Sequence, residues 1–288
     1  MATAIVVGAG IVGATVCKAL LRAGHDARTF DTLSFPAGTN ASGGHLKPSW
    51  FSGVPKEQYT PAMELLSELW GLEESDFRVR PTRKTVKIWR VDTDQILSER
   101  LHTNERKKVT EVFYTRDKPC VRTYTPKEGE EEFEPDLLVV CAGAWTAKLV
   151  GSRWTGGTDY KKGISFRMKQ DLPRPFVKPW APYKQVVAHQ QGDQEIWIGD
   201  GTAILSKNWK EGHVIQCRKR CLKAVNLHEN AIIREIVGVR GYNKHDKSQP
   251  CLFRKLANHT YVVCGAAKNG TIAAGWAAQE IVRAAESL

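Results

Sequence analysis

The sequence has no long apolar run, and nowhere in its 288 residues is there a stretch approaching the roughly 20 residues that a membrane-spanning helix needs. The apolar stretch at its N-terminus has no basic leader, so we expect no signal peptide and a cytoplasmic protein. There is no Cys-x-x-Cys pair, and the seven cysteines lie mostly in apolar runs. These features favour free thiols in a reducing compartment over a disulfide framework.

The composition is that of an ordinary globular chain, with 42% hydrophobic and 25% charged residues. The length suits one large domain or two interleaved ones. We expect no metal. Cys217 and Cys221 lie four residues apart, with His213 and His228 nearby, but this spacing matches no common zinc site.

Positive charge is in excess, with a net charge of +11 and a pI of about 9.3. The excess is clustered, above all at residues 106–108, 207–210 and 218–223. A field of this sign favours polyanions such as nucleic acid, although an ordinary basic surface would give the same count. The sequence has no base-reading motif, so any contact with nucleic acid is expected to be mainly with phosphates.

A glycine pattern near the N-terminus carries the clearest signal. Residues 4–7 read as a buried strand and residues 11–23 as a helix, with Gly8, Gly10 and Gly13 at the turn between them. Gly8 permits a tight turn, Gly10 lets a pyrophosphate approach the backbone, and Gly13 lets the helix pack closely on the strand. The N-terminus of the helix would supply free N–H groups to the phosphates.

A second strand, residues 26–30, follows the helix and ends at Asp31. An acid at this distance from the first glycine is placed to bind a ribose hydroxyl. The order of strand, glycines, helix, strand and acid predicts dinucleotide binding. A plain βαβ unit is the alternative, and it leaves the three glycines unexplained.

Three loops of small residues follow strand-like runs, at residues 39–44, 142–145 and 265–271. In a parallel sheet these loops would meet at one edge, which is where ligands of open α/β sheets bind. Between them, residues 163–169, 185–191 and 195–205 read as antiparallel strands. We also expect a helix over 61–72 that starts at a proline, and a solvated acidic turn over 126–135.

We therefore predict an α/β fold in which a Rossmann-type nucleotide domain is interleaved with a mostly antiparallel substrate domain. The expected nucleotide domain comprises 1–80, 105–160 and 236–288. The expected substrate domain comprises 81–104 and 161–235.

Five segments in order resemble the D-amino-acid-oxidase superfamily of flavoproteins, in particular its glycine and sarcosine oxidase branch. They are VVGAGIVGATVCKALLRAGHDARTFD (6–31), TNASGGHLKP (39–48), DLLVVCAGAWT (136–146), GVRGYNKHDKSQP (238–250) and YVVCGAAKNGTIAAGWAAQEI (261–281). The resemblance implies FAD as the cofactor and a glutathione-reductase-like nucleotide domain. In the fourth segment, Gly241 and the pair Lys244 and His245 replace the Pro and Thr typical of the family.

The resemblance also implies roles for particular residues. Those expected at the cofactor are Gly8, Gly10, Ile11, Val12, Gly13, Asp31, Thr39, Ser42, Gly43, Gly44, Ala142, Gly143, Asn269, Gly270 and Thr271. Arg240 matches the arginine that meets the substrate carboxylate, and Lys268, His45 and Tyr242 are further candidates near it. Three of them have a plain alternative: a surface or structural ion pair for Arg240, a solvated side chain for Lys268 and a cap of the loop for His45.

The substrate is left open between three classes. The chain is short for the family, and a trimmed cover suits a bulky substrate. Together with the basic charge, this suggests an N-glycyl-methyl pyrimidine in nucleic acid, in DNA in preference to tRNA, cleaved to an aminomethyl base and glyoxylate. Compact bacteriophage lyases that trim glycyl-thymine, and the oxidase part of the enzyme that modifies wobble uridine in tRNA, resemble the chain in this respect. The alternatives are an oxidase of free glycine, sarcosine or D-amino acids, and a non-catalytic protein that binds flavin or nucleic acid.

Overall fold

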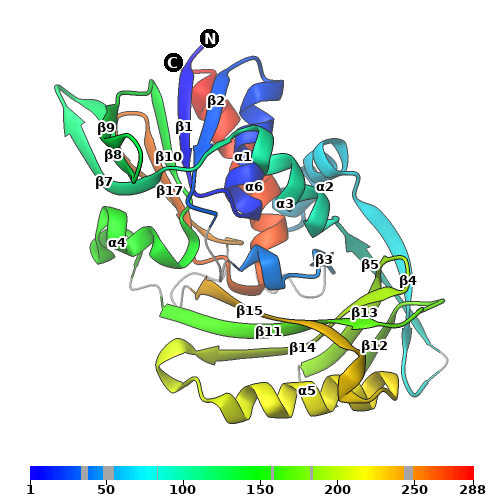
Figure 1. The fold of residues 1–288 in the computed structure, drawn as a ribbon. Coiled ribbons are helices and arrows are strands. Elements are labelled where there is room, and N and C mark those ends of the chain that lie inside the picture. Colours follow the sequence, from blue (N-terminus) through cyan, green and yellow to red (C-terminus); the bar gives the residue numbers. More distant parts are fainter. Residues whose placement is uncertain (34–37, 48–54, 83, 157–158, 182–183, 243–248) are drawn as a thin grey trace.

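The computed structural model describes residues 1–33, 38–47, 55–82, 84–156, 159–181, 184–242 and 249–288. It has two large sheets, with the strands of one running toward a face of the other, and a smaller sheet at one side (Figure 1). Within the described residues no helix is both long and apolar enough to cross a bilayer.

The first large sheet has six strands in the order β16-β17-β10-β1-β2-β6. Their bounds are β1 Thr3–Val7, β2 Asp26–Phe30, β6 Asn104–Glu105, β10 Leu137–Val140, β16 Leu252–Ala257 and β17 Thr260–Cys264. β1 is central and pairs in parallel with both β10 and β2. Because β10 also pairs in parallel with β17, the carboxyl ends of four neighbouring strands lie at the same edge.

Helices cover one face of this sheet. They are α1 (Ile11–Arg22), α2 (Lys56–Trp70), α3 (Thr93–Glu99) and α6 (Gly270–Ala285). α1 and α6 pack on Val6 and Val139 through residues such as Leu20 and Ile281, all of which are fully buried. Burying one such side chain contributes roughly 1.5–3 kcal/mol, so this layer is the main core of the nucleotide half.

The opposite face is covered by a three-stranded antiparallel sheet of β7 (Lys108–Thr115), β8 (Lys118–Thr125) and β9 (Gly129–Phe133), together with the short helix α4 (Thr146–Val150). β9 corrects the sequence expectation of an acidic turn over 126–135. The segment forms a strand because its glutamates meet cations next to it. Arg122 of β8 pairs with Glu132 at 2.7 Å, and the Lys107 ammonium contacts Glu131.

The second large sheet has eight strands in the order β15-β11-β14-β13-β12-β4-β5-β3. Their bounds are β3 His45–Leu46, β4 Glu73–Val79, β5 Thr85–Arg90, β11 Asp159–Lys169, β12 Phe176–Ala181, β13 Lys184–Gly192, β14 Glu195–Leu205 and β15 Ile232–Tyr242. The pairings are antiparallel except for that of β12 with β4. The predicted antiparallel strands are thus confirmed, with β12 and β4 as additions.

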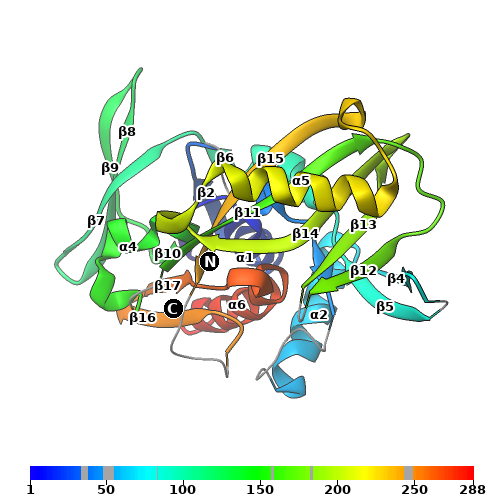
Figure 2. The same cartoon turned by 90° about the horizontal axis from the view of Figure 1, so that it is seen from below.

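Helix α5 (Glu211–Val225) packs on the outer face of the eight-stranded sheet, where Cys217 and Leu222 meet Phe166 and Ile198. The helix lies on the side of this sheet that faces away from the six-stranded sheet (Figures 1 and 2). Two of its arginines are paired with strand residues: Arg218 with Glu235 at 2.8 Å and Arg220 with Asp200 at 2.6 Å.

Helix α2 also differs from the prediction. It begins at Lys56 and not at Pro61, which lies inside the helix. It ends at Trp70 because Gly71 adopts a left-handed conformation, with a φ of 66°, and closes the last turn.

The expected domain boundaries stay a prediction. The strand memberships differ from them, since β3, β4 and all of β15 belong to the eight-stranded sheet. We propose that the two large sheets, and not those boundaries, mark the two halves. The chain crosses between the halves repeatedly, as an interleaved arrangement requires.

Candidate functional site

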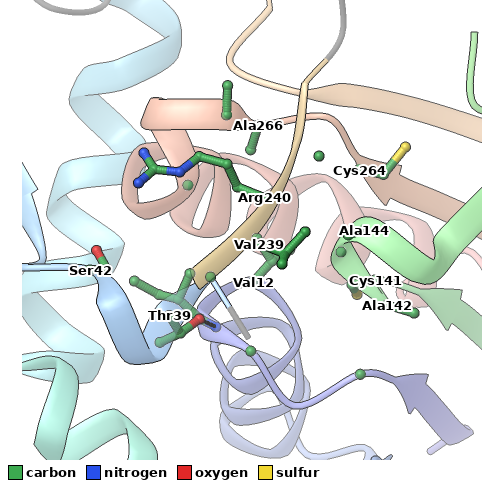
Figure 3. A pocket seen from close by; sticks show the side chains of 18 of the residues that line it. Val12, Thr39, Ser42, Cys141, Ala142, Ala144, Val239, Arg240, Cys264 and Ala266 are labelled. Atoms are coloured by element: carbon green, nitrogen blue, oxygen red, sulfur yellow. Dashed lines mark hydrogen bonds between the residues drawn. The ribbon is translucent and has the colours of Figure 1, made fainter. Parts of the chain in front are cut away.

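A cavity of about 1280 Å³ lies between the two large sheets. Its wall contains the three small-residue loops that the sequence predicted to meet, namely the turn η1 (Thr39–Ala41) with its continuation to Gly43, the segment Ala142–Trp145, and the segment 265–271. Figure 3 shows Thr39 and Ser42 on one side of this cavity and Ala142 and Ala144 on the other. Single-ligand pockets usually measure about 300–1,000 Å³, so this cavity has room for more than a small molecule.

The glycine turn after β1 forms one end of the cavity. Gly8 has a φ of 101°, a left-handed conformation that favours glycine, and a Cβ there would lie 2.6 Å from the carbonyl oxygen of Cys141. A Cβ at Gly13 would lie 1.8 Å from the carbonyl oxygen of Gly8, so α1 can approach the turn only without one. Gly10 is the N-cap of α1 and brings no side chain to the cavity, which leaves space for a phosphate at the helix N-terminus.

Asp31 lies at the end of β2 and lines the same cavity. Its carboxylate accepts hydrogen bonds from the backbone N–H groups of Ala9 and Leu33, both at 2.6 Å. Thr39 closes this corner from η1, because its hydroxyl accepts a hydrogen bond from the Ile11 N–H at 2.8 Å. The predicted acid is therefore held beside the glycine turn, as ribose recognition requires.

The loop that follows η1 is shaped by two glycines. Gly44 has a φ of 67°, and a Cβ on it would lie 2.1 Å from the carbonyl oxygen of Val91. A Cβ on Gly43 would lie 2.5 Å from the ring of His45. Gly44 and Gly13 shape the backbone without lining the cavity, whereas Gly43 and Ser42 form part of its wall.

Arg240 reaches the cavity from β15 (Figure 3). Its guanidinium lies above Gly163 of β11, where a Cβ would be 2.4 Å from Nη2. Burial lowers the pKa of Arg240 below its usual value, although the group remains a cation. No carboxylate in the described part of the chain forms an ion pair with it, so the site presents an uncompensated, forked donor to whatever fills the cavity.

Tyr242 and His45 line other parts of the wall. Lys161 places its ammonium 3.6 Å from the centre of the Tyr242 ring, a cation–π contact. His45 Nε2 lies 3.0 Å from His189 Nδ1, and His189 Nε2 lies 2.7 Å from Gln191 Oε1. Because the amide oxygen only accepts, His189 carries its proton on Nε2, and His45 donates from its own Nε2.

The two histidines are neutral. Burial, with His189 and Arg90 nearby, holds the pKa of His45 well below its usual 6.5. Burial and Arg90 lower the pKa of His189 to about 3. Trp197 stacks on His189 with ring centres 5.4 Å apart, so the pair is enclosed by an aromatic wall. At neutral pH the wall near His45 therefore offers hydrogen bonding without charge.

The cysteines at the cavity are also uncharged. Burial raises the pKa of both Cys141 and Cys251, so each remains a thiol. All seven cysteines lie within the described residues and are buried, and none of them forms a disulfide. Among the described residues, no three His, Cys, Asp or Glu side chains gather as a metal site would need.

Most of the residues expected at the site line this one cavity, namely Gly8, Gly10, Ile11, Val12, Asp31, Thr39, Ser42, Gly43, His45, Ala142, Gly143, Arg240, Tyr242, Asn269, Gly270 and Thr271. Lys268 lies in the turn η8 (Ala267–Asn269), but its side chain is outside the described part of the structure. Residues 243–248 of the fourth family-like segment are likewise outside it.

Sequence reasoning missed the strand residues of the cavity. Gln185 comes from β13, and Trp197, Gly199 and Thr202 come from β14. Lys108 is the first residue of β7, and Lys107 directly precedes that strand. The alternation of residues in β13 and β14 could have indicated an inward face, but not which ligand that face would meet.

The arrangement fits a dinucleotide. The glycine turn and the N-terminus of α1 suit a pyrophosphate, Asp31 suits a ribose, and Asn269 leaves its buried Oδ1 without a hydrogen-bond partner at the wall. The long cavity then has space beyond the nucleotide for a ring system and a substrate near Arg240.

Comparisons with known proteins agree with this geometry. A family model described as FAD dependent oxidoreductase (DAO) matches residues 97–284. Glycine oxidase from Bacillus cereus ATCC 14579 superimposes with a TM-score of 0.73 at 16% identity, over 100% of this chain and 95% of that one. Iminodiacetate oxidase from Chelativorans sp. BNC1 gives 0.73 at 14% identity, over 99% and 95% of the two chains.

A third structure, glycerol-3-phosphate dehydrogenase from Bacillus halodurans complexed with FAD, gives a TM-score of 0.70 at 13% identity, over 100% of this chain and 65% of that one. A comparison with curated protein sequences found no match. The predicted fold class and the predicted cofactor are both confirmed. The family model covers well over half of the sequence, and the chain therefore belongs to the DAO family of FAD-dependent oxidoreductases.

Proposed function

We propose that the protein uses FAD to oxidise a secondary amine of the glycyl type, with Arg240 binding the carboxylate of the substrate. The observation that carries this proposal is the Arg240 guanidinium. It is held in the cavity wall over Gly163, without a carboxylate partner among the described residues. A buried guanidinium of this kind is stabilised when a planar carboxylate binds to it through two hydrogen bonds.

FAD, when bound, supplies the two-electron oxidation of the carbon–nitrogen bond to an iminium, which water hydrolyses to an amine and glyoxylate. The residues of this chain bind and orient the substrate. Arg240 fixes its acid end, and the neutral His45 offers a hydrogen bond without adding a second positive charge to the wall. The eight-stranded sheet forms one wall of the cavity, through residues such as Trp197, Gly199 and Arg240.

The residues proposed to hold FAD are those of the glycine turn, the η1 loop, Ala142–Gly143 and Asn269–Thr271. Gly8, Gly10 and the N-terminus of α1 would bind the pyrophosphate, and Asp31 would bind the ribose. The remaining loops would provide backbone contacts to the ring system. Their support is that all of them share one cavity wall.

The test of the amine proposal is reduction of the bound flavin under anaerobic conditions, followed by its absorbance. Iminodiacetate, sarcosine and glycine should reduce the wild-type protein. Arg240→Ala should raise the substrate concentration needed by about 100-fold while FAD stays bound, because a charged pair of hydrogen bonds is lost. Arg283→Ala, which removes an exposed arginine from α6, is the matched control. Equal reduction of the Arg240 and Arg283 variants would rule out the assigned role.

We further propose that the glycyl amine is carried on a pyrimidine base of nucleic acid, DNA more than tRNA, and that the products are an aminomethyl base and glyoxylate. On this proposal the protein acts as a C–N lyase of the kind that some bacteriophages use to modify DNA. Three features support it: the size of the cavity, the small residues Gly199, Gly201 and Ala203 at its wall, and the aromatic rings of Trp197 and Tyr242. Such a surface can accept a flat base.

Only some of the basic residues are placed to contact a nucleic acid at the cavity. Lys108 and Lys148 are exposed and line the cavity, so a strand approaching the cavity would meet them. The basic cluster on α5, by contrast, lies on the far side of the eight-stranded sheet (Figure 2). Any nucleic acid bound at the cavity would not reach α5 without wrapping around the sheet.

Oxidation of a free small amine is the second candidate, favoured by the likeness in fold to glycine oxidase and iminodiacetate oxidase. The two candidates differ in their expected response to an oligonucleotide that carries a glycyl-methyl-deoxyuridine. Bleaching by this oligonucleotide, weakened by salt, would support the nucleic-acid substrate. Bleaching by the free amines alone would support the second candidate, and no bleaching by either would indicate a non-catalytic flavoprotein.

A further inference from the structure

A second hollow, separate from the FAD cavity, lies on the other side of the η1 turn. It measures about 530 Å³ and is referred to here as the arginine groove. Its lining residues are Leu33, Asn40, Asp94, Leu97, Arg100, Leu101, Arg106, Arg167, Glu195, Ile233, Arg234 and Ile236. Most of them come from η1, from α3 and the turn η3 (Arg100–His102) after it, and from the neighbouring strands β15, β11 and β14. Leu33 follows β2, and Arg106 lies between β6 and β7.

Positive charge dominates the groove. Four arginines face two acids, Asp94 and Glu195. Arg167 uses both acids, at 2.7 Å to Asp94 and 3.7 Å to Glu195. Arg100 donates to the backbone carbonyl of Ala9 at 2.9 Å, and Arg106 is exposed and pairs with no carboxylate of the described residues. Arg106 therefore offers the groove a cation that no acid of the described residues neutralises, whereas Arg100 also lies in the field of the Asp31 carboxylate.

Several buried polar atoms at the groove lack partners. They are Oδ1 and Nδ2 of Asn40, Nε of Arg100 and Nη1 of Arg167. The three residues are only 7%, 8% and 7% exposed. A buried polar atom without a hydrogen bond costs about 1–3 kcal/mol, so a ligand in the groove gains free energy if the side chains that line it turn these atoms toward it. The arginines need acceptors, whereas the amide of Asn40 needs both an acceptor and a donor.

An apolar rim adds a third requirement. Leu101 and Ile233 line the groove and are 53% and 55% exposed, which is high for large aliphatic side chains. A nucleotide meets all three conditions: phosphate suits guanidinium groups, a base edge offers a donor beside an acceptor to an Asn amide, and a base face covers apolar surface.

We propose that the arginine groove binds a nucleotide unit, with its phosphate at Arg106 and Arg100 and its base toward Asn40. The same chemistry is offered by a nucleotide within a nucleic-acid strand and by a free nucleotide. The proposal goes beyond the amine oxidation proposed above and does not depend on it. If the strand carries the substrate, the groove is a second anchor, separated from the cavity only by η1, whose Thr39 and Ala41 line the cavity while Asn40 lines the groove.

The experiment uses the FAD-loaded protein and a fluorescein-labelled single-stranded oligodeoxyadenylate, with fluorescence anisotropy at about 0.1 M salt. AMP and inorganic phosphate are added as competitors. Arg106→Ala removes an exposed side chain and should leave folding and flavin absorbance intact. Ile233→Asp places an acid on the rim. Arg283→Ala removes one exposed arginine elsewhere and is the charge-matched control.

We expect both groove variants to weaken oligonucleotide binding at least about fivefold, Arg106→Ala to lower the salt slope by about one, and the control to match the wild type. AMP should compete at lower concentration than phosphate. If AMP binds with this pattern of variants but the oligonucleotide does not, the groove is a free-nucleotide site. Equal binding by Arg106→Ala and Arg283→Ala, or phosphate competing as well as AMP, would overturn the proposal. None of these readouts involves flavin reduction, so failure here is distinct from failure of the proposed oxidation.

Discussion

The two large sheets contribute to the cavity in different ways. The six-stranded sheet presents backbone: its strand ends are followed by small residues such as Gly8, Ala142 and Gly265, and contacts to a ligand would come from N–H groups and a helix terminus. The eight-stranded sheet presents side chains, among them Arg240, His45 and Trp197. The six-stranded half thus offers backbone that a ligand can approach closely, and the eight-stranded half offers the side chains that a ligand would contact.

The same contrast appears between two arginines of the eight-stranded layer. Arg220 from α5 binds Asp200, whose side chain is fully buried, through Nε at 2.6 Å. Arg240, on the opposite side of the layer, has no such partner among the described residues. A paired arginine stabilises the fold, whereas an unpaired one in a cavity is available for a ligand.

The largest effect should follow from Gly13→Ala. The new methyl group would have to lie 1.8 Å from the carbonyl oxygen of Gly8, which is backbone and cannot yield, so α1 must move away from β1. We expect a loss of about 3 kcal/mol or more, and a protein that no longer retains FAD. Flavin absorbance and the melting temperature measure both.

The control is Gly212→Ala, at the start of α5, where a Cβ meets no atom within 4 Å. It makes the same exchange in the other half of the molecule and should change neither reading. A Gly13→Ala protein that remains yellow and melts like the control would mean that close approach is not required at the glycine turn.

Asp200→Ala should come next, because it breaks the paired arginine. Burial alone would raise the pKa of Asp200, but hydrogen bonds from Cys217, Thr202 and Arg220 lower it, so the wild-type group is a carboxylate. Its removal should cost about 2 kcal/mol in urea unfolding while substrate affinity stays unchanged. If substrate affinity changed by more free energy than stability did, Arg220 would also serve substrate binding, and the contrast with Arg240 would be wrong.

Gly163→Ala should have a smaller effect, confined to the substrate. A Cβ there would lie 2.4 Å from Arg240 Nη2, the end of a flexible side chain that can move aside, and 3.1 Å from the backbone carbonyl oxygen of Thr202, which must give by a few tenths of an ångström. The cost to stability should therefore be smaller than that of Gly13→Ala. We expect KM for a glycyl amine to rise about tenfold, the equivalent of about 1.4 kcal/mol, with flavin still bound. Steady-state kinetics would show this. An unchanged KM would indicate that the position of Arg240 does not matter.

The smallest effect concerns pH. The pKa of His189 is about 3 in the folded protein and about 6.5 when exposed, so unfolding takes up a proton below pH 6.5. Stability is therefore lost as the pH falls from 6.5 toward 3. His189→Gln should remove the contribution of this histidine to the pH dependence. The difference in unfolding free energy between pH 7 and pH 5.5 should therefore become smaller by about 1 kcal/mol. Parallel pH dependence in both proteins would contradict the neutral assignment.

The backbone-presenting half could be predicted in detail from the sequence. The glycine turn, β1, β2 and the meeting of three small-residue loops follow from local patterns: apolar runs, helical spacing and glycines at strand ends. A parallel sheet then brings those loops together without any further information. The ends of these elements were predicted to within about a residue or two, which is the range over which different definitions of an element's end also vary.

The side-chain-presenting half could be predicted only in part. β4 is a polar strand and β12 contains Pro179, so neither shows the usual alternation. The contact of His45 with His189 spans 144 residues, and no local pattern connects them. The strand β9 was missed because the cations that pair with its glutamates come from other strands. In each case a tertiary contact, and not a local preference, decides the structure.

The interleaved path of the chain has a consequence for the cofactor. The cavity wall contains segments from Val7 to Thr271, which belong to both layers. One bound dinucleotide would therefore contact parts of the polypeptide that are far apart in the sequence. With FAD bound, the two layers should therefore unfold together in one thermal transition. Without FAD, each layer should unfold separately.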